Sequence, residues 1–416
     1  MILILFRYSL IIKLLRLRTM KFNIIVLVLL FQTALAQPKV ANSPQLSPHA
    51  EISIITLGPW QGELYSAFGH SAIRVYDPEH SVDAFYNYGV FSFNQPNFYL
   101  NFARGHLNYR LDVDPYTPWR DYYISNNRFV HEQILNLNAE QTQKVFDYLY
   151  WNTMPENQYY MYDYFYNNCA TKLRDVLKVT LKDEVAFDST FITTDYTIRE
   201  LTDLYLQHQP WGDLGIDICL GLPMDKHASP YEYMFLPDYI EQSFDHATVR
   251  RDSVTVPLVK TKVPVHESVP EELPRTVLHP WLVFGLLLVI TLAITWRDIK
   301  SHKQSKWFDV TLFGIVGLLG VLLLVLWTAT DHRAAARNLN ILWAMPLHLV
   351  FIPLYLRSKG VARTYFKGIT LLNILVLLTW AWLPQQLNVF LIPVVIALTV
   401  RAWRIGWPSY EMSSRQ

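Results

Sequence analysis

The sequence predicts an α+β exported domain followed by a membrane domain of five helices. Three observations support this fold class. The N-terminus has the order of a signal peptide, the chain up to about Pro274 is rich in Tyr, Asn and Asp, and from about His279 to Arg404 it is almost continuously apolar. Apolar runs that approach roughly 20 residues can cross a bilayer. A soluble domain joined to a membrane domain is therefore expected.

Residues 1–36 are predicted to be a signal peptide. A basic stretch that ends at Lys21 precedes the apolar core Ile24–Phe31, and Ala34-Leu35-Ala36 supplies small residues for cleavage before Gln37. Met20 is an alternative start, because the pattern is already complete from that residue. An uncleaved anchor helix is the other interpretation of this segment.

The exported domain is expected over residues 37–247, with strands first and helices later. Period-2 alternation and flanking turn residues indicate strands, and apolar residues at helical spacing indicate helices. The expected strands are Glu51–Leu57, Ala72–Asp77, Phe85–Phe91, Asn108–Val113 and Arg128–Leu137, and the expected helices are Ala139–Trp151, Cys169–Leu177 and Thr194–Leu206. Residues 211–236 contain Gly and Pro throughout and predict irregular structure, and residues 248–278 predict a linker.

The membrane domain is expected over residues 279–404, with a cytoplasmic tail at 405–416. The five expected spans are Pro280–Trp296, Phe308–Thr328, Leu339–Tyr355, Gly368–Leu383 and Val389–Val400. Lys and Arg gather in the loop 297–306, after the third span and in the tail, and such residues mark cytoplasmic loops. The exported domain then lies in the periplasm of a bacterial inner membrane, and the C-terminus lies in the cytoplasm.

One loop expected to face outward carries polar groups at the membrane surface. We expect His332, Asn338 and Asn340 to bind a lipid headgroup, because polar groups at this depth are costly and are often functional. A solvated loop is the alternative.

Cys169 and His70 are the predicted nucleophile and base. The chain has only two cysteines, and Cys169 begins a predicted helix that Asn167 or Asn168 would cap. A thiol there faces unpaired backbone N–H groups, which lower its pKa. Two alternatives stay open: a disulfide between Cys169 and Cys219 in an oxidising compartment, and a structural core histidine at position 70.

A base must be oriented, and the expected orienting group is Asn87 on the strand next to His70, with His80 as a weaker candidate. Residues near the pair are expected to contact substrate or the oxyanion; they are Tyr65, Ser66, Ser71 and Asn168. The remaining histidines have no metal-ligand spacing, so no metal is expected. A net charge of +1 makes nucleic acid an improbable partner, and no cofactor motif is visible.

The residues around the pair resemble the Lnb-type family, which is similar to lipoprotein N-acyl transacylases. The similarity lies in three stretches: 64–75 (LYSAFGHSAIRV), 88–91 (YGVF) and 166–175 (YNNCATKLRD). The resemblance implies a permuted papain-like (NlpC-like) domain in which Cys169 carries the acyl group and His70 is its base.

The resemblance and the topology together indicate a membrane-bound acyltransferase that forms a thioester. The acceptor would be the N-terminal amine of a diacylglyceryl-lipoprotein, and the acyl group would come from a phospholipid or from the lipoprotein's own glyceride. Two alternatives remain: a papain-like hydrolase of the cell wall, and a non-catalytic membrane-anchored binding module.

Overall fold

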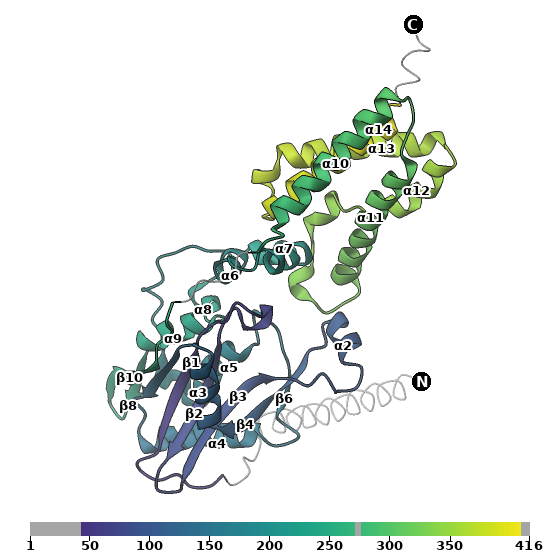
Figure 1. Ribbon diagram of the computed structural model, residues 1–416. Coiled ribbons are helices and arrows are strands. Elements are labelled where there is room, and N and C mark those ends of the chain that lie inside the picture. The colour runs from purple at the N-terminus through teal and green to yellow at the C-terminus, as the bar shows by residue number, and fades with distance from the viewer. Residues whose placement is uncertain (1–42, 271–275, 409–416) are drawn as a thin grey trace, which may run out of the picture. The chain divides into compact units, whose positions relative to one another are not determined.

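The computed structural model describes residues 43–270 and 276–408, and the predicted signal peptide lies outside this part of the chain. The described chain contains an N-terminal sheet domain of mixed α/β type and a C-terminal helical domain (Figure 1). The expected succession of a sheet domain and a membrane domain is therefore confirmed.

The sheet has seven antiparallel strands in the order β10-β5-β1-β2-β3-β4-β6. The strands are β1 (Glu51–Leu57), β2 (His70–Asp77), β3 (Val82–Val90), β4 (Asn108–Pro115), β5 (Val130–Leu135), β6 (Tyr159–Met161) and β10 (Val259–His266). The five strands expected from periodicity all form, with ends shifted by a few residues. Strand ends depend on pairing partners, which local sequence does not specify.

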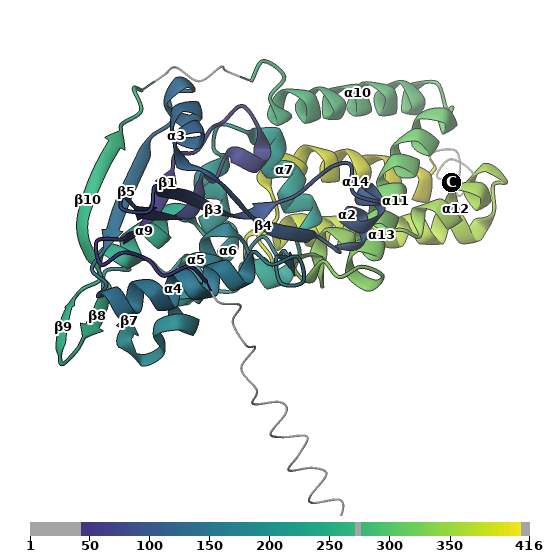
Figure 2. The same ribbon diagram turned by 90° about the horizontal axis from the view of Figure 1, so that it is seen from below.

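Helices cover both faces of this sheet (Figure 2). Side chains alternate along a strand, so Ile54 and Ile73 pack in one core with α4 and α5, while Ile55 and Ala72 pack in another with α3. The helices of this domain are α2 (Phe98–Arg104), α3 (Tyr116–Ser125), α4 (Ala139–Asn152), α5 (Cys169–Leu181), α6 (Ile198–Leu206), α7 (Pro210–Cys219), α8 (Pro230–Tyr233) and α9 (Pro237–Asp245).

Two sequence-based assignments in this domain are wrong. Residues 248–266, expected to be a linker, form β8 (Thr248–Arg251), β9 (Val254–Pro257) and β10. Strand β8 pairs with β9 and with β7 (Val185–Ala186), and β10 pairs with β5. Pro and Lys suggested a linker, but both residues are tolerated on edge strands, where one side has no pairing partner. The second error is 211–236, which contains α7 and α8 instead of irregular structure alone.

Four helices in the described residues are long and apolar enough to cross a membrane: Pro280–Lys300 (α10), Lys306–Thr328 (α11), Gly360–Leu378 (α13) and Val389–Gly406, which contains α14 (Ile392–Gly406). The third expected span, Leu339–Tyr355, is not one helix. It consists of a 3₁₀ turn at Leu339–Leu342 and the nine-residue α12 (His348–Leu356), so the expected count of five spanning helices is not confirmed.

The break in the third segment has a local cause. Proline lacks an N–H and clashes with the preceding turn, and Pro346 lies between the 3₁₀ turn and α12. Gly320 of α11 also packs so closely against this segment that a Cβ there would clash with the Ala344 carbonyl oxygen. The interrupted backbone is therefore covered by protein, as it must be at membrane depth.

A buried ion cluster joins three membrane helices. Arg401 of α14 is fully buried and pairs with Asp298 of α10 at 3.0 Å and with Asp309 of α11 at 2.6 Å. The Tyr355 hydroxyl also donates to Asp309 at 2.6 Å. Removing one member of such a cluster would leave an unpaired buried charge and would destabilise the packing of these helices.

Candidate active site

Cys169 is the first residue of α5, and Asn168 is the N-cap. The Asn168 side chain accepts from the Thr171 N–H at 2.9 Å, and the Asn168 N–H donates to the Thr171 hydroxyl at 2.8 Å. This reciprocal pair is a capping box, which begins the helix at a defined residue. The thiol therefore lies at the positive end of the helix dipole, and only 9% of Cys169 is exposed.

His70 and Asn87 come from neighbouring strands of the sheet. His70 begins β2, and Asn87 lies in β3 and is buried. The His70 Nε2 and the Asn87 Oδ1 are 2.7 Å apart. With Nε2–H donating to that amide oxygen, Nδ1 is the ring nitrogen left to exchange a proton with the thiol. The structure thus places together the three residues that the sequence analysis named.

The environment of Cys169 favours the thiolate. Burial alone would raise the pKa of Cys169, but the charge and hydrogen bond of His70 and the backbone N–H groups of Ser71 and Ala170 outweigh burial and lower that pKa. Only the ionised sulfur is a competent nucleophile. Cys219 is also a free thiol, and burial raises its pKa. The two sulfurs are not bridged, so the disulfide alternative does not hold.

The environment of His70 favours the imidazolium. Burial alone would lower the pKa of His70, but the negative charge and hydrogen bond of Cys169 and the hydrogen bond to Asn87 raise it. The positive charge of nearby Arg128 acts in the opposite direction and lowers the pKa of His70. The two opposite shifts describe one thiolate–imidazolium pair, in which each charged partner stabilises the other.

Gly89 lies where the start of α5 approaches the sheet. It has φ +93°, and a Cβ built there would lie 3.7 Å from Cys169 Cβ and 3.5 Å from the Tyr162 ring. The pairing of β3 with β4 shifts register between Tyr88 and Val90, so Gly89 is where the strand bends. The sequence analysis did not name Gly89 or Tyr162 as site residues, although Gly89 lies inside one of the family-like stretches.

Arg128 and Tyr123 also lie near the pair and were missed. The Arg128 guanidinium lies 4.1 Å from the centroid of the Tyr123 ring, and its Nε donates to the Gly58 carbonyl at 2.8 Å. Both residues are buried. Nothing in the local sequence distinguishes this arginine, because its importance comes from strands that meet only in the fold.

The four residues expected to contact substrate near the pair lie in different environments. Tyr65 is 77% exposed, whereas Ser66 donates to the Trp60 and Glu63 carbonyls at 2.9 Å. Ser71 is fully buried, and its backbone N–H forms a hydrogen bond with the Cys169 sulfur. The Asn168 amide is occupied by the cap and by the Tyr164 and Phe235 carbonyls. Ser66 and Asn168 therefore use their side chains within the protein, whereas the buried Ser71 hydroxyl has no hydrogen-bond partner among the residues that the structure describes.

The three predicted headgroup ligands bond to protein groups. Asn338 donates to the Ile218 carbonyl at 2.8 Å, Asn340 donates to the Asp217 carbonyl at 3.1 Å, and both asparagines are buried. His332 Nε2 lies 3.0 Å from the Phe102 carbonyl oxygen. The polar side chains of this loop thus form hydrogen bonds with α7 and α2. Headgroup binding by these residues stays a prediction.

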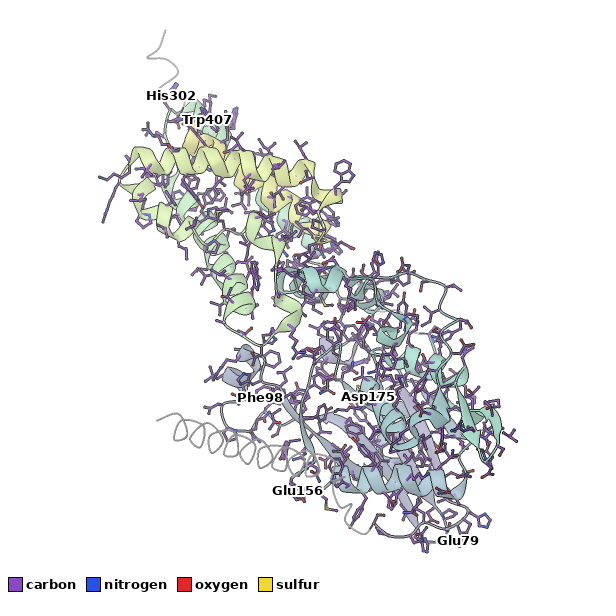
Figure 3. All side chains as sticks on the ribbon, turned by 180° about the vertical axis from the view of Figure 1, so that it is seen from behind. Glu79, Phe98, Glu156, Asp175, His302 and Trp407 are labelled. Atoms are coloured by element: carbon purple, nitrogen blue, oxygen red, sulfur yellow. The ribbon has the colours of Figure 1, made fainter. Side chains whose placement is uncertain are left out.

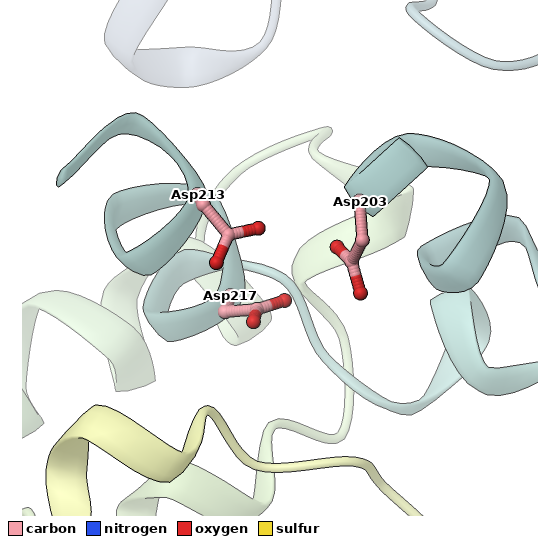
Figure 4. Close-up of side chains that lie close together, drawn as sticks. All are labelled: Asp203, Asp213 and Asp217. Atoms are coloured by element: carbon pink, nitrogen blue, oxygen red, sulfur yellow. The ribbon is translucent and has the colours of Figure 1, made fainter. Parts of the chain in front are cut away.

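A cluster of three carboxylates lies on α6 and α7, away from the Cys–His pair in the sequence (Figure 4). One oxygen each of Asp203, Asp213 and Asp217 lies within 4.8 Å of the others. Arg199 and Asn388 both donate to Asp217, and burial together with the neighbouring carboxylates raises the pKa of Asp203 to about 8. Protonation of Asp203 and the Arg199 charge thus offset part of the negative charge of the cluster.

Comparison with known families agrees with this architecture. Residues 43–203 match the family model described as the Lnb N-terminal periplasmic domain, and residues 272–412 match the one described as the Lnb transmembrane domain. No curated protein and no solved structure matches the chain. The two family matches cover more than half of the chain in the expected order. The chain is a membrane protein with a periplasmic N-terminal domain, which implies the inner membrane, and it belongs to the Lnb family.

Proposed function

We propose that the protein is an acyltransferase that moves a fatty acyl chain to the N-terminal amine of lipoproteins through a thioester on Cys169. The observation that carries the proposal is the buried Cys169–His70 pair with Asn87 2.7 Å from the ring. Membrane attachment through the Lnb transmembrane domain supports a lipid substrate.

In the first half-reaction, the Cys169 thiolate, whose proton is held on His70 Nδ1, attacks the ester carbonyl carbon of a membrane lipid. The carbonyl oxygen becomes an oxyanion, which backbone N–H groups at the start of α5 are positioned to stabilise; one such donor contributes about 3 kcal/mol. The C–O bond of the ester then breaks, and His70 gives its proton to the departing alcohol of the lysolipid.

In the second half-reaction, the amine of a diacylglyceryl-cysteine attacks the thioester carbonyl carbon. His70 takes a proton from the attacking nitrogen, the C–S bond breaks, and the sulfur returns as the thiolate of the ion pair. Asn87 holds the ring in the tautomer that both transfers need. The aromatic rings of Tyr160 and Tyr162, both partly buried, limit the access of water to the thioester.

The test is acylation of the purified full-length protein in lipid vesicles, followed by peptide mass spectrometry. We expect a hydroxylamine-sensitive acyl group on the peptide that contains Cys169, and its transfer to a synthetic diacylglyceryl lipopeptide. Cys219→Ser is the matched control and should retain the adduct, whereas Cys169→Ser should lose it.

Vesicles with a labelled acyl chain only on the phospholipid, or only on the lipopeptide, identify the donor. Cleavage of muropeptides without transfer to the lipopeptide would favour a cell-wall hydrolase. Failure of Cys169 to react with any thiol reagent at neutral pH would favour a binding module.

A further inference from the structure

Several large apolar side chains of the segment 91–104 are exposed. Phe93 is 63% exposed, Tyr99 76%, Leu100 56% and Phe102 42%. They lie on and just before α2, the short helix on which Phe98 is labelled in Figure 3. A contiguous exposed apolar patch on a soluble domain marks an interaction surface.

This segment is attached to the end of a membrane helix. Asp331 follows the last residue of α11, Thr328, by three positions. The Asp331 N–H donates to the Arg104 carbonyl at 2.8 Å, and the Asp331 carboxylate lies 2.7 Å from His106 Nε2. Gly105 permits the contact, because a Cβ there would lie 2.9 Å from the Asp331 backbone.

The attachment sets the depth of α2. Three residues span at most about 11 Å, so the C-terminal end of α2 lies within that distance of the end of a helix long enough to cross the membrane. The headgroup region adds about 5–8 Å on each side of the hydrocarbon core. The apolar side chains of α2 therefore lie close to the membrane surface, where amphipathic helices insert, and exposed Arg104 is suited to anionic headgroups.

A row of aromatic rings leads from this segment to the nucleophile. The Phe98 ring stacks on Phe91 at 5.8 Å, Phe91 on Tyr109 at 4.9 Å, and Tyr109 contacts Tyr162 at 4.5 Å. Tyr162 and Cys169 both lie next to Gly89, since a Cβ built on Gly89 would be 3.5 Å from the Tyr162 ring and 3.7 Å from Cys169 Cβ. We call these four rings the aromatic row. Its outer end, Phe98, is 7% exposed and belongs to the exposed apolar segment, and its inner end, Tyr162, borders the same glycine as Cys169.

We propose that residues 91–104 insert into the outer leaflet of the inner membrane, and that the aromatic row is the surface along which a fatty acyl chain passes from the bilayer to Cys169. Insertion stands on the contacts above. The acyl-chain role rests on the proposed function and deepens it, because it assigns where the lipid substrate enters. Flat aromatic rings suit an acyl chain, since their faces offer it a continuous apolar surface.

Insertion is tested without any chemistry at Cys169. In the full-length Cys169→Ser, Cys219→Ser protein, Leu100→Cys is labelled with a nitrobenzoxadiazole fluorophore and reconstituted in vesicles of phosphatidylethanolamine and phosphatidylglycerol. Val254→Cys on β9 is the matched control, because Val254 is 62% exposed. Doxyl-labelled lipid should quench the label at position 100 at least threefold more than the label at 254. Equal quenching would overturn insertion.

The acyl-chain role is tested with Phe91→Asp, which places a charge in the aromatic row. Acylation of Cys169 by long-chain lipid in vesicles should fall at least tenfold, while acylation by water-soluble p-nitrophenyl acetate and alkylation by iodoacetamide stay within twofold of the parent protein. Tyr122→Asp changes an aromatic of 53% exposure outside the segment and should leave all three rates unchanged.

The outcomes separate the two proposals. Equal losses for short and long acyl donors in Phe91→Asp would overturn the acyl-chain role even with Cys169 confirmed as the nucleophile. A parent protein that accepts no acyl group from any donor would overturn both the acyl-chain role and the proposed function, and the quenching result would still decide insertion.

Discussion

Replacing Asn87 with Ala should make Cys169 less reactive, although Asn87 does not itself take part in bond making. The change removes the acceptor 2.7 Å from His70 Nε2 and leaves a buried ring nitrogen without that partner. The imidazolium form of His70 loses more hydrogen-bond free energy than the neutral form does, because hydrogen bonds from charged donors are stronger. The thiolate–imidazolium pair is therefore less stable in the variant.

The expected size follows from the difference between the two kinds of bond. A neutral hydrogen bond contributes about 1 kcal/mol and one with a charged partner about 2 kcal/mol. The difference of about 1 kcal/mol corresponds to nearly one pKa unit. The pKa of His70 should fall and that of Cys169 should rise, so alkylation at neutral pH should slow by about five- to tenfold.

Iodoacetamide alkylation between pH 5 and 10, read by peptide mass spectrometry, measures this shift. Cys219 is an internal control, since burial and not an ion pair sets its raised pKa. Asn152→Ala is the matched variant. Asn152 accepts a hydrogen bond of 2.6 Å from the hydroxyl of Tyr88, which neighbours Asn87 on β3, so this change removes a partly buried amide acceptor without altering the contact of His70. Asn87→Asp restores an acceptor and should recover the low thiol pKa.

The reasoning would be refuted by an Asn87→Ala profile that superimposes on the parent profile while Cys169 still reacts. An equal shift in Asn152→Ala would also refute it, because the effect would then come from loosened packing and not from the ring. In either case Asn87 would be a structural residue of β3.

Three further predictions concern stability and can be read from thermal unfolding of the full-length protein in detergent. Asn168→Ala removes the cap of α5 and should cost about 1 kcal/mol; an unchanged Tm would show that tertiary contacts alone begin the helix. Gly89→Ala places a side chain at φ +93° and should cost about 1–2 kcal/mol, whereas a gain in Tm would contradict a strained position. The raised pKa of Asp203, about 8, means that the folded state holds a proton that the unfolded chain releases above its ordinary pKa near 4. Stability from this group therefore falls as pH rises from about 4 to 8. Asp203→Asn should accordingly raise Tm more at pH 8 than at pH 5, and an equal gain at both values would argue against a shared proton in the cluster.

Local sequence patterns predicted the features that depend on near neighbours along the chain. The helix start at Cys169 depends on Asn168 and Thr171, three residues apart, and the five strands depend on period-2 alternation within each segment. The apolar spans depend on composition alone, and four of them form helices of the expected kind. Pro346 was visible too, yet an apolar window of normal length concealed the break that it makes in the third span.

The remaining features depend on contacts between distant parts of the chain, which local sequence patterns do not contain. Pairing with β5 turns an apparent linker into β10, because an edge strand gains its hydrogen bonds only when its neighbour is present. Gly89, Tyr162 and Arg128 become neighbours of the nucleophile only when the strands and α5 meet. The Asp331 contact likewise joins residues more than two hundred positions apart and places α2 at the end of a membrane helix. Residue types and short spacings thus predicted the pair of Cys169 and His70, whereas the surroundings that shift the pKa values of these two residues came from packing in three dimensions.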